Sequence, residues 1–435
     1  MIRPTIEKGG ISRRAYLKGT GSAGAVGLAL LAGCTARGQQ GSDSNTLEIV
    51  HWWTAGGEKE ALQALLDGYK KKYPGIQVQN NPAPGGAGSA LDTVIKNRVL
   101  NQNPPSTFQI WPGQSLTPYI QGNVLNDIGD SVWTQEVQNA YLESVRNTAK
   151  PAGNYVAVPL NIHRLNNLFY NADVVKQAGV DPKSIGDPTA LGNALDTVSS
   201  KTEATPMAHS TQEAWTTLQL WETVFIGSHG SDAFLDLVTG NAQQHQDQIK
   251  QSLRQVKQYS GNFNEDSGSI SWDQANSKVI NGEAAFVQQG DWAAGQYEAA
   301  GNFEYQKQWD YVPFPGTGGV YSMVIDSFVY PKNNPSPDAT EKFLAYCASV
   351  DAQRRFNPIK GSIPPRTDVP MAPFGPFLQS QIRDFKSSKS QPTTIAHGSA
   401  VVPAVKSNME EAFASFTESW NVDSTASRIQ DAFQA

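Results

Sequence analysis

The chain has 435 residues, of which 39% are hydrophobic and 17% are charged, and its formal net charge is −6. This length exceeds one ordinary hydrophobic core, so we expect two domains of similar size. The mildly acidic balance gives no electrostatic basis for binding nucleic acid or an anionic membrane surface. We therefore expect no nucleic-acid partner.

Residues 1–34 are predicted to be an export signal. The paired arginines Arg13 and Arg14 precede a modest apolar run over residues 19–32, which is too short and too weak to span a bilayer permanently. Paired arginines at this place are typical of a twin-arginine leader. We expect export across the cytoplasmic membrane.

The apolar run ends in Leu31-Ala32-Gly33-Cys34, which is similar to the lipobox of exported lipoproteins. That similarity implies that Cys34 is lipidated and anchors the protein to the outer face of the cytoplasmic membrane. The polar segment 35–45, rich in Gly, Gln and Ser, is predicted to be a flexible tether. The other cysteine, Cys347, lies in an apolar helical run, and we expect it to be buried without a disulfide.

The elements after the tether alternate between strand and helix. Strands are predicted at 47–51, 76–79 and 107–111, and apolar residues at helical spacing follow the first two strands, over 62–69 and 91–99. This order is typical of an open α/β sheet, in which ligands bind beyond the carboxyl ends of the strands.

The chain becomes more helical after a further predicted strand over 155–161, where we expect a first crossing into a second lobe. Helices are predicted at 189–199, 214–226 and 246–259, and residues 272–296 mix helix and strand. Two further crossings are expected near 309–330 and 357–362.

The loop after the first strand has a composition suited to a sugar. In Leu47–Glu58 the strand breaks into Trp52 and Trp53, two glycines and a carboxylate. Tryptophan faces pack on the C–H face of a pyranose, glycines let the backbone approach a ligand, and a charged acceptor binds hydroxyl groups strongly. The alternative is structural, because aromatic residues at the end of a strand commonly belong to the core.

Five motifs together resemble the family-1 extracellular solute-binding proteins of ABC importers, and the glucose/mannose-binding members in particular. In chain order the motifs are His51-Trp52-Trp53-Thr54-Ala55-Gly56-Gly57-Glu58, Pro159-Leu160-Asn161-Ile162-His163-Arg164, Gly290-Asp291-Trp292-Ala293, Asp326-Ser327-Phe328 and Phe356-Asn357-Pro358-Ile359-Lys360-Gly361-Ser362. The resemblance implies an α/β, two-lobed periplasmic-binding-protein-like (type II) fold with a ligand cleft between the lobes. The expected lobes are 46–160 with 322–357, and 161–321 with 358–435.

The resemblance also implies which residues contact the sugar: Trp52, Trp53, Glu58, Trp292, Asp326, Lys360 and His397. Carboxylates would accept hydrogen bonds from hydroxyl groups, Lys360 and His397 would donate them, and the tryptophans would stack. Each residue has a structural alternative: Glu58 at a helix N-terminus, Asp326 in a turn, Lys360 at the surface and Trp292 in the core.

Two positions leave the specificity open. Trp111 stands where relatives commonly carry a basic or imidazole side chain, so a hydrogen-bond donor is replaced by a stacking plane, and we include it among the sugar contacts. His163 is expected either to line the cleft or to be a histidine near the hinge that is satisfied by the backbone.

The resulting prediction is a lipoprotein that captures a monosaccharide, glucose or mannose, and delivers it to the permease subunits of an ABC importer by closing its lobes over the ligand. We expect a monomer without cofactor, metal or enzymatic activity. Three alternatives stay open: an oligosaccharide ligand, a receptor that reports sugar to a signalling partner, and a glycosidase that uses Glu58 and Asp326 as its carboxylate pair.

Overall fold

The structure, a computed structural model, describes residues 45–55, 57–83 and 88–434. The predicted export signal, the predicted lipidation at Cys34 and the predicted tether up to residue 44 lie outside the described residues. Within these ranges, no helix combines the length and the apolar character that a membrane span needs.

The first lobe is built on a five-stranded sheet with the order β2-β1-β3-β11-β4. Its strands are β1 (Thr46–His51), β2 (Gln77–Pro82), β3 (Thr107–Ile110), β4 (Ala157–Pro159) and β11 (Ser327–Val329). Strand β1 pairs in parallel with β2 and β3, whereas β11 is antiparallel to β3 and β4. All residues of β3, β4 and β11 are buried, as expected for strands covered on both faces.

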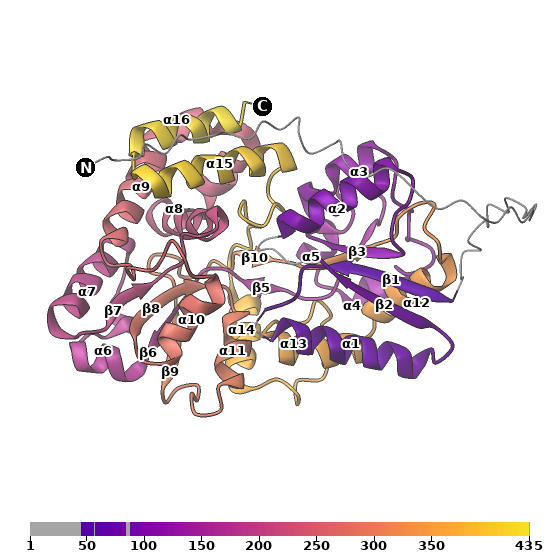
Figure 1. Ribbon diagram of the computed structural model, residues 1–435, viewed down its shortest axis with the longest axis horizontal. Helices are drawn as coiled ribbons and strands as arrows, with labels where there is room; N and C mark the ends of the chain where they lie inside the picture. The colour runs from indigo at the N-terminus through magenta and orange to yellow at the C-terminus, as the bar shows by residue number, and fades with distance from the viewer. Residues whose placement is uncertain (1–44, 56, 84–87, 435) are drawn as a thin grey trace, which may run out of the picture. The chain divides into compact units, whose positions relative to one another are not determined.

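Helices cover both faces of this sheet (Figure 1). They are α1 (Glu58–Lys72), α2 (Ser89–Leu100), α3 (Thr117–Gln121), α4 (Gln135–Ala140), α5 (Glu143–Thr148), α12 (Pro337–Cys347) and α13 (Val350–Lys360). The predicted apolar face of α1 is confirmed, because Leu62, Leu65 and Tyr69 are at most 2% exposed. Cys347 is free and buried, as predicted.

The second lobe is built on a four-stranded sheet with the order β7-β8-β6-β9. Its strands are β6 (Asn167–Asn171), β7 (Thr205–Ala208), β8 (Ala284–Gln289) and β9 (Trp309–Pro313). Its helices are α6 (Ala172–Ala178), α7 (Pro188–Lys201), α8 (Ala214–Asp236), α9 (Gln246–Ser260), α10 (Trp272–Ile280), α11 (Ala293–Ala299), α14 (Pro376–Ser387), α15 (Pro403–Ser419) and α16 (Val422–Ala432). The C-terminal pair α15 and α16 packs against α8 and α9 (Figure 1).

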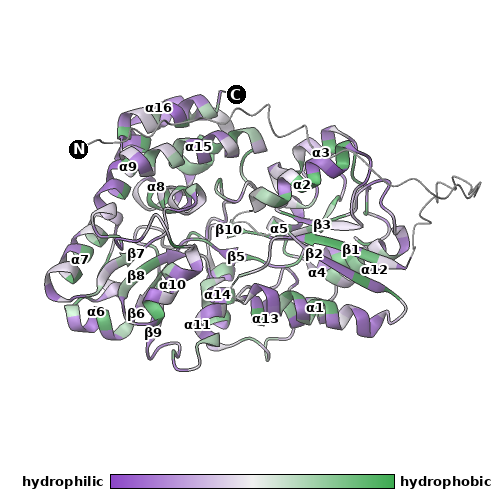
Figure 2. Cartoon of the chain, viewed as in Figure 1, coloured by the Kyte–Doolittle hydropathy of each residue, from purple (hydrophilic) through white to green (hydrophobic). Residues whose placement is uncertain are grey.

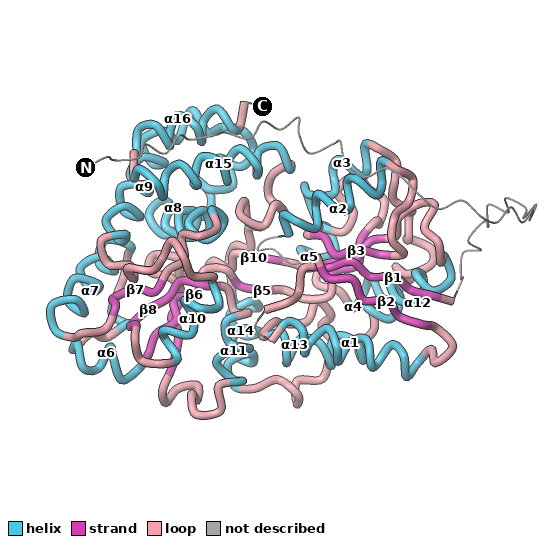
Figure 3. The backbone as a smooth tube through the Cα atoms, in the orientation of Figure 1, coloured by secondary structure: helices cyan, strands magenta, loops and turns pink. Residues whose placement is uncertain are grey.

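The two sheets form separate groups of strands, each surrounded by helices (Figure 3). Each lobe has its own core: one contains Trp133 and Phe328, and the other contains Trp221 and Phe225. Hydrophobic residues run along β1 and β8, while α1 and α13 present many hydrophilic residues on the side in view (Figure 2).

Short pairings join the segments where the sequence predicts crossings between the lobes. The short strands β5 (His163–Arg164) and β10 (Met323–Val324) pair with each other, and Ile162 forms an isolated bridge with Ile363. The predicted boundary between residues 357 and 358 falls inside α13, which packs along α1. Helix α13 continues to Lys360, and Gly361, in the left-handed conformation with φ 76°, ends it.

Candidate functional site

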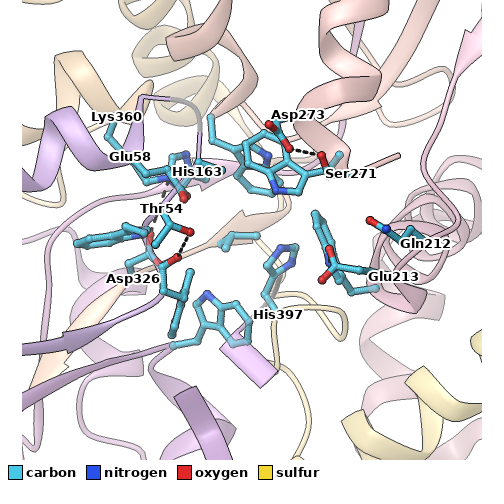
Figure 4. A pocket seen from close by; sticks show the side chains of 18 residues that line it. Thr54, Glu58, His163, Gln212, Glu213, Ser271, Asp273, Asp326, Lys360 and His397 are labelled. Carbon is cyan, nitrogen blue, oxygen red and sulfur yellow. Dashed lines mark hydrogen bonds and ion pairs between the residues drawn. The ribbon is translucent and has the colours of Figure 1, made fainter. Parts of the chain in front are cut away.

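A cavity of about 250 Å³ lies where the crossing segments meet the two sheets. Side chains from both lobes line it, and Figure 4 shows Glu58, Lys360 and Asp326 on one side and Ser271, Asp273 and Glu213 on the other. The structure brings all eight predicted contact residues to this cavity: Trp52, Trp53, Glu58, Trp111, Trp292, Asp326, Lys360 and His397. That they contact a sugar stays a prediction.

Glu58 and Lys360 form a buried ion pair on the first-lobe side. Lys360 Nζ lies 3.1 Å from Glu58 Oε1, and the two side chains are only 3% and 14% exposed. Glu58 begins α1 and Lys360 ends α13, so the close packing of these two helices brings the charges together. Burial raises the pKa of Glu58, and the ammonium group of Lys360 opposes that shift.

The approach of the two helices depends on a glycine. A Cβ atom added to Gly57 would lie 2.9 Å from the carbonyl oxygen of Ile359, which is closer than real Cβ contacts. Glycine at this position therefore lets the first turn of α1 reach the end of α13.

Asp326 is held by two side-chain amides. Gln109 Nε2 donates to Asp326 Oδ1 at 3.1 Å, and Asn161 Nδ2 donates to Asp326 Oδ2 at 2.7 Å. Burial raises the pKa of Asp326, while Lys360 and the two amides oppose the shift. An ionised carboxylate has about four acceptor positions, so these two bonds leave capacity for a ligand hydroxyl.

His163 lies in crossing strand β5 and also lines the cavity, so both positions considered from the sequence are realised. Its ring contacts the side chains of Asp291 and Asn161, and a backbone hydrogen bond at Gly361 also acts on its pKa. Nδ1 contacts the carboxylate of Asp291, and Nε2 lies 3.1 Å from Asn161 Nδ2. Burial lowers the pKa of His163 well below its ordinary value, with Lys360 adding to the effect, so the ring is neutral. A neutral ring that donates from Nδ1 and accepts at Nε2 fits both contacts.

The two adjacent tryptophans have different surroundings. Trp53 is 1% exposed and packs on Phe356 and Phe328, with ring centroids 4.9 and 5.8 Å apart. Trp52 is only partly buried, and its ring lies 4.8 Å from that of Trp111. The core interpretation therefore fits Trp53, whereas Trp52 and Trp111 form an aromatic wall of the cavity.

His397 connects the aromatic side chains of the two lobes. Its ring centroid lies 5.3 Å from Trp111 in the first lobe, and 5.4 and 5.9 Å from Trp292 and Trp215 in the second. Burial lowers the pKa of His397 to about 3, with Lys406 and Lys360 adding to the shift. A neutral imidazole still donates one hydrogen bond, so the donor role predicted for it remains chemically available.

The second lobe contributes a wall of the cavity that was not predicted from the sequence. The missed residues are Gln212, Glu213, Trp215, Ser271, Trp272 and Asp273. They surround the first residues of α8 and α10, and Ser271 forms a capping box with Gln274. The Ser-Trp-Asp-Gln sequence is a recognisable helix start, but no local sequence pattern shows that this helix start faces a cavity.

Four helices, α1, α8, α10 and α11, begin beside the cavity. Helix N-termini carry partial positive charge, which favours acceptor oxygens nearby. Among the described residues no group of three His, Cys, Asp or Glu side chains is arranged to hold a metal ion. The arrangement is suited to holding a polar ligand with an apolar face.

Residues 55–354 match the family described as bacterial extracellular solute-binding protein. An uncharacterized ABC transporter extracellular-binding protein of Pyrococcus horikoshii is 36% identical over 433 residues, covering 97% of this chain and 96% of that protein. The xylose/arabinose-binding protein XacG of Haloferax volcanii is 34% identical over an alignment of 450 residues, covering 96% of each chain.

Solved structures share the fold. A chitin oligosaccharide binding protein superposes with a TM-score of 0.78 at 16% sequence identity, over 90% of this chain and 98% of that one. The predicted two-lobed α/β fold is therefore confirmed. This chain belongs to the bacterial extracellular solute-binding protein family.

Proposed function

We propose that this protein is the sugar-binding component of an ABC importer, which captures a neutral sugar in the cavity and delivers it to a membrane permease. The observation that carries the proposal is the lining of the cavity, where six tryptophans surround buried hydrogen-bonding groups. The tryptophans are Trp52, Trp53, Trp111, Trp215, Trp272 and Trp292. Aromatic planes beside carboxylate, amide and ammonium groups match a ring with hydroxyl groups and an apolar C–H face.

The charge of the cavity favours an uncharged ligand. Among the described residues that line it are four carboxylates, those of Glu58, Glu213, Asp273 and Asp326, and one ammonium group, that of Lys360. Both lining imidazoles, His163 and His397, have lowered pKa values and are neutral near pH 7. An anionic ligand would meet net repulsion, so sugar phosphates and sugar acids fit poorly.

The size of the main cavity favours one sugar ring. At about 250 Å³ it lies just below the range of roughly 300 to 1,000 Å³ that is common for ligand pockets. Among monosaccharides we propose glucose or mannose, on the motif resemblance. The pentose-binding relative XacG makes xylose and arabinose the first competitors to test.

Lobe closure is the mechanism we propose. The first lobe supplies Trp52, Trp111 and the Glu58–Lys360 pair, while the second supplies Trp215, Trp272 and Trp292. A sugar that touches both walls binds the closed arrangement more tightly than an open one and so shifts the population towards closure. The closed lobes would then dock on the permease.

We propose no catalytic role for Glu58 and Asp326. Lys360 pairs with Glu58, and two amides hold Asp326, so both carboxylates have partners suited to ligand binding. Anchoring through lipid on Cys34 after twin-arginine export, and action as a monomer, belong to the same proposal.

Calorimetric titration tests the function directly. The purified protein is titrated with glucose, mannose, galactose, xylose, arabinose and glucose 6-phosphate. We expect one neutral sugar to bind with one-to-one stoichiometry and the phosphate ester to bind at least about tenfold more weakly. Absence of binding by every neutral sugar, in protein that circular dichroism shows to be folded, would reject the proposal.

A further inference from the structure

Four buried polar side chains form a continuous series of hydrogen bonds that ends on Asp326. They are Asp291, which follows β8 of the second lobe, Asn161 and His163 in the crossing segment, and Asp326, which precedes β11 of the first lobe. Each is at most 3% exposed. His163 and Asp326 line the cavity (Figure 4), whereas Asn161 and Asp291 stand behind them. We call these four side chains the buried network.

Two backbone N–H groups fix the direction of the amides that hold Asp326. The N–H of Asp326 donates to Asn161 Oδ1 at 2.8 Å, and the N–H of Trp52 donates to Gln109 Oε1 at 3.1 Å. A backbone N–H can only donate, so each amide turns its oxygen towards it and its nitrogen towards the carboxylate of Asp326. Both oxygens of Asp326 therefore accept from amide N–H groups.

The amide of Asn161 in turn fixes the tautomer of His163. One hydrogen on Asn161 Nδ2 points at Asp326 Oδ2, and the same nitrogen lies 3.1 Å from His163 Nε2. Nε2 must accept there, so the single proton of the neutral ring lies on Nδ1, which contacts the carboxylate of Asp291.

Asp291 is the fixed end of the buried network. One oxygen accepts from His163 Nδ1, and the other accepts from the backbone N–H of Arg164 at 3.0 Å. The backbone N–H of Asp291 donates to the carbonyl oxygen of Arg164 at 3.1 Å, which holds the residue in place. Burial raises the pKa of Asp291, and the N–H of Arg164 opposes the shift. Because both oxygens face N–H donors, these contacts suit the carboxylate form.

We propose that Asp291 and His163 are positioning residues that keep Asp326 a hydrogen-bond acceptor, so that the bound sugar must present a free hydroxyl to it. This inference rests on the proposed sugar-binding function. Every bond from Asp291 to Asp326 has its donor and acceptor fixed by the one before, so reversing one requires reversing the next. A hydroxyl donates to Asp326, whereas a fluorine at the same ring position cannot.

Asp291→Asn tests the buried network because it keeps the shape of the side chain and replaces one acceptor by a donor. The backbone N–H of Arg164 cannot change, so the new amide turns its oxygen towards it and its nitrogen towards His163. The ring then carries its proton on Nε2, which points at Asn161 Nδ2. That clash displaces the amide that donates to Asp326.

Asp384→Asn is the matched control. Asp384 accepts from Arg164 Nη1 at 2.9 Å, but its side chain is 37% exposed and lies outside the buried network. Both variants therefore remove one carboxylate beside the same arginine. Only Asp291→Asn changes a partner of His163.

Two measurements are made on wild type and both variants. Nitrogen NMR of the imidazole rings reports the tautomer, and the signal of His163 among the six histidines is the one lost in His163→Phe. Calorimetry compares the preferred monosaccharide with analogues in which each hydroxyl in turn is replaced by fluorine.

In wild type we expect the Nδ1–H tautomer at His163, and at least one fluorinated analogue that binds about tenfold or more weakly than the sugar. Asp291→Asn should move the proton to Nε2, weaken the sugar, and reduce the loss for one analogue to below about threefold. The losses for the other analogues should stay within about twofold of wild type. Asp384→Asn should change neither the tautomer nor any of these ratios.

Three results would overturn the positioning role while leaving sugar binding intact. They are an Nε2–H tautomer in wild type, as expected if the ring serves the backbone at Gly361, unchanged ratios in folded Asp291→Asn, and equal effects of the two Asp→Asn variants. If Asp291→Asn does not fold, His163→Phe replaces it, since it removes the acceptor for Asn161 and should reduce the same loss. Failure of every sugar to bind wild type would reject the sugar-binding function, and the role in recognition with it.

Discussion

Lys360 Nζ lies 3.1 Å from Glu58 Oε1 although 302 positions separate the two residues along the chain, and both side chains are largely removed from water. Loss of one partner leaves the other charge buried without compensation, which costs more than the pair itself contributes.

Lys360→Met should therefore lower the free energy of unfolding by about 3 kcal/mol and abolish sugar binding, because Glu58 loses its counter-charge. Urea unfolding and calorimetry measure the two effects. Lys71→Met, at an exposed position in the last turn of α1, is the control and should change stability by less than about 0.5 kcal/mol. Equal stability of the two variants would show that the buried pair does not stabilise the fold.

The adjacent tryptophans give a second prediction, because only one of them is in the core. Trp53→Ala should destabilise the protein by about 3 to 5 kcal/mol through the cavity it leaves. Trp52→Ala should cost far less stability but weaken sugar binding by about tenfold or more, since it removes a stacking plane. Thermal unfolding and titration of both variants separate the roles. The interpretation fails if Trp52→Ala destabilises as strongly as Trp53→Ala.

Glu222, on α8, gives a prediction about pH. Its carboxyl is fully buried and accepts from the backbone N–H of Ile395 at 2.8 Å, and burial raises its pKa to about 8. A carboxyl with a raised folded-state pKa binds its proton more tightly when folded, so stability is greatest below the unfolded pKa near 4.5 and is lost as pH rises towards 8.

Glu222→Gln removes the titration and keeps an acceptor for Ile395. Relative to wild type, the variant should gain stability between pH 5 and pH 8, so urea midpoints measured across that range should diverge with increasing pH. If the urea midpoints of the two proteins differ by the same amount at every pH, Glu222 does not titrate in this range. Because the loop it holds leads directly to His397, sugar affinity is a useful second measurement.

Gly57 gives the fourth prediction. Gly57→Ala places a Cβ 2.9 Å from the carbonyl oxygen of Ile359, so α1 and α13 must separate slightly. We expect a loss of about 1 to 3 kcal/mol in stability, together with weaker sugar binding as Glu58 and Lys360 move apart. Gly75→Ala is the control, since nothing lies within 4 Å of its added Cβ and its φ is not positive. If Gly57→Ala and Gly75→Ala unfold with the same free energy, the close approach of α1 and α13 does not require glycine at position 57.

Features that depend on local periodicity and on motif order could be predicted from the sequence. Apolar residues at helical spacing predicted α1, α7 and α9, and the alternation of strands and helices predicted the first sheet. The family resemblance implied the two-lobed fold and seven sugar contacts, and Trp111 was added to them; the structure places all eight residues around one cavity. These patterns can be recognised in a sequence because each involves residues that are close together in the chain.

Which side chains face each other could be read only from the folded structure. Trp52 and Trp53 are adjacent in the chain, but Trp53 packs on Phe356 while Trp52 reaches Trp111. Trp215 and Trp272 lie in the first turns of α8 and α10, and no local sequence feature distinguishes these helix starts from others. Their place in the cavity wall depends on how the two helices pack in the second lobe. Contacts between residues far apart in the chain depend on how whole helices and sheets pack, and no local pattern in the sequence encodes that packing.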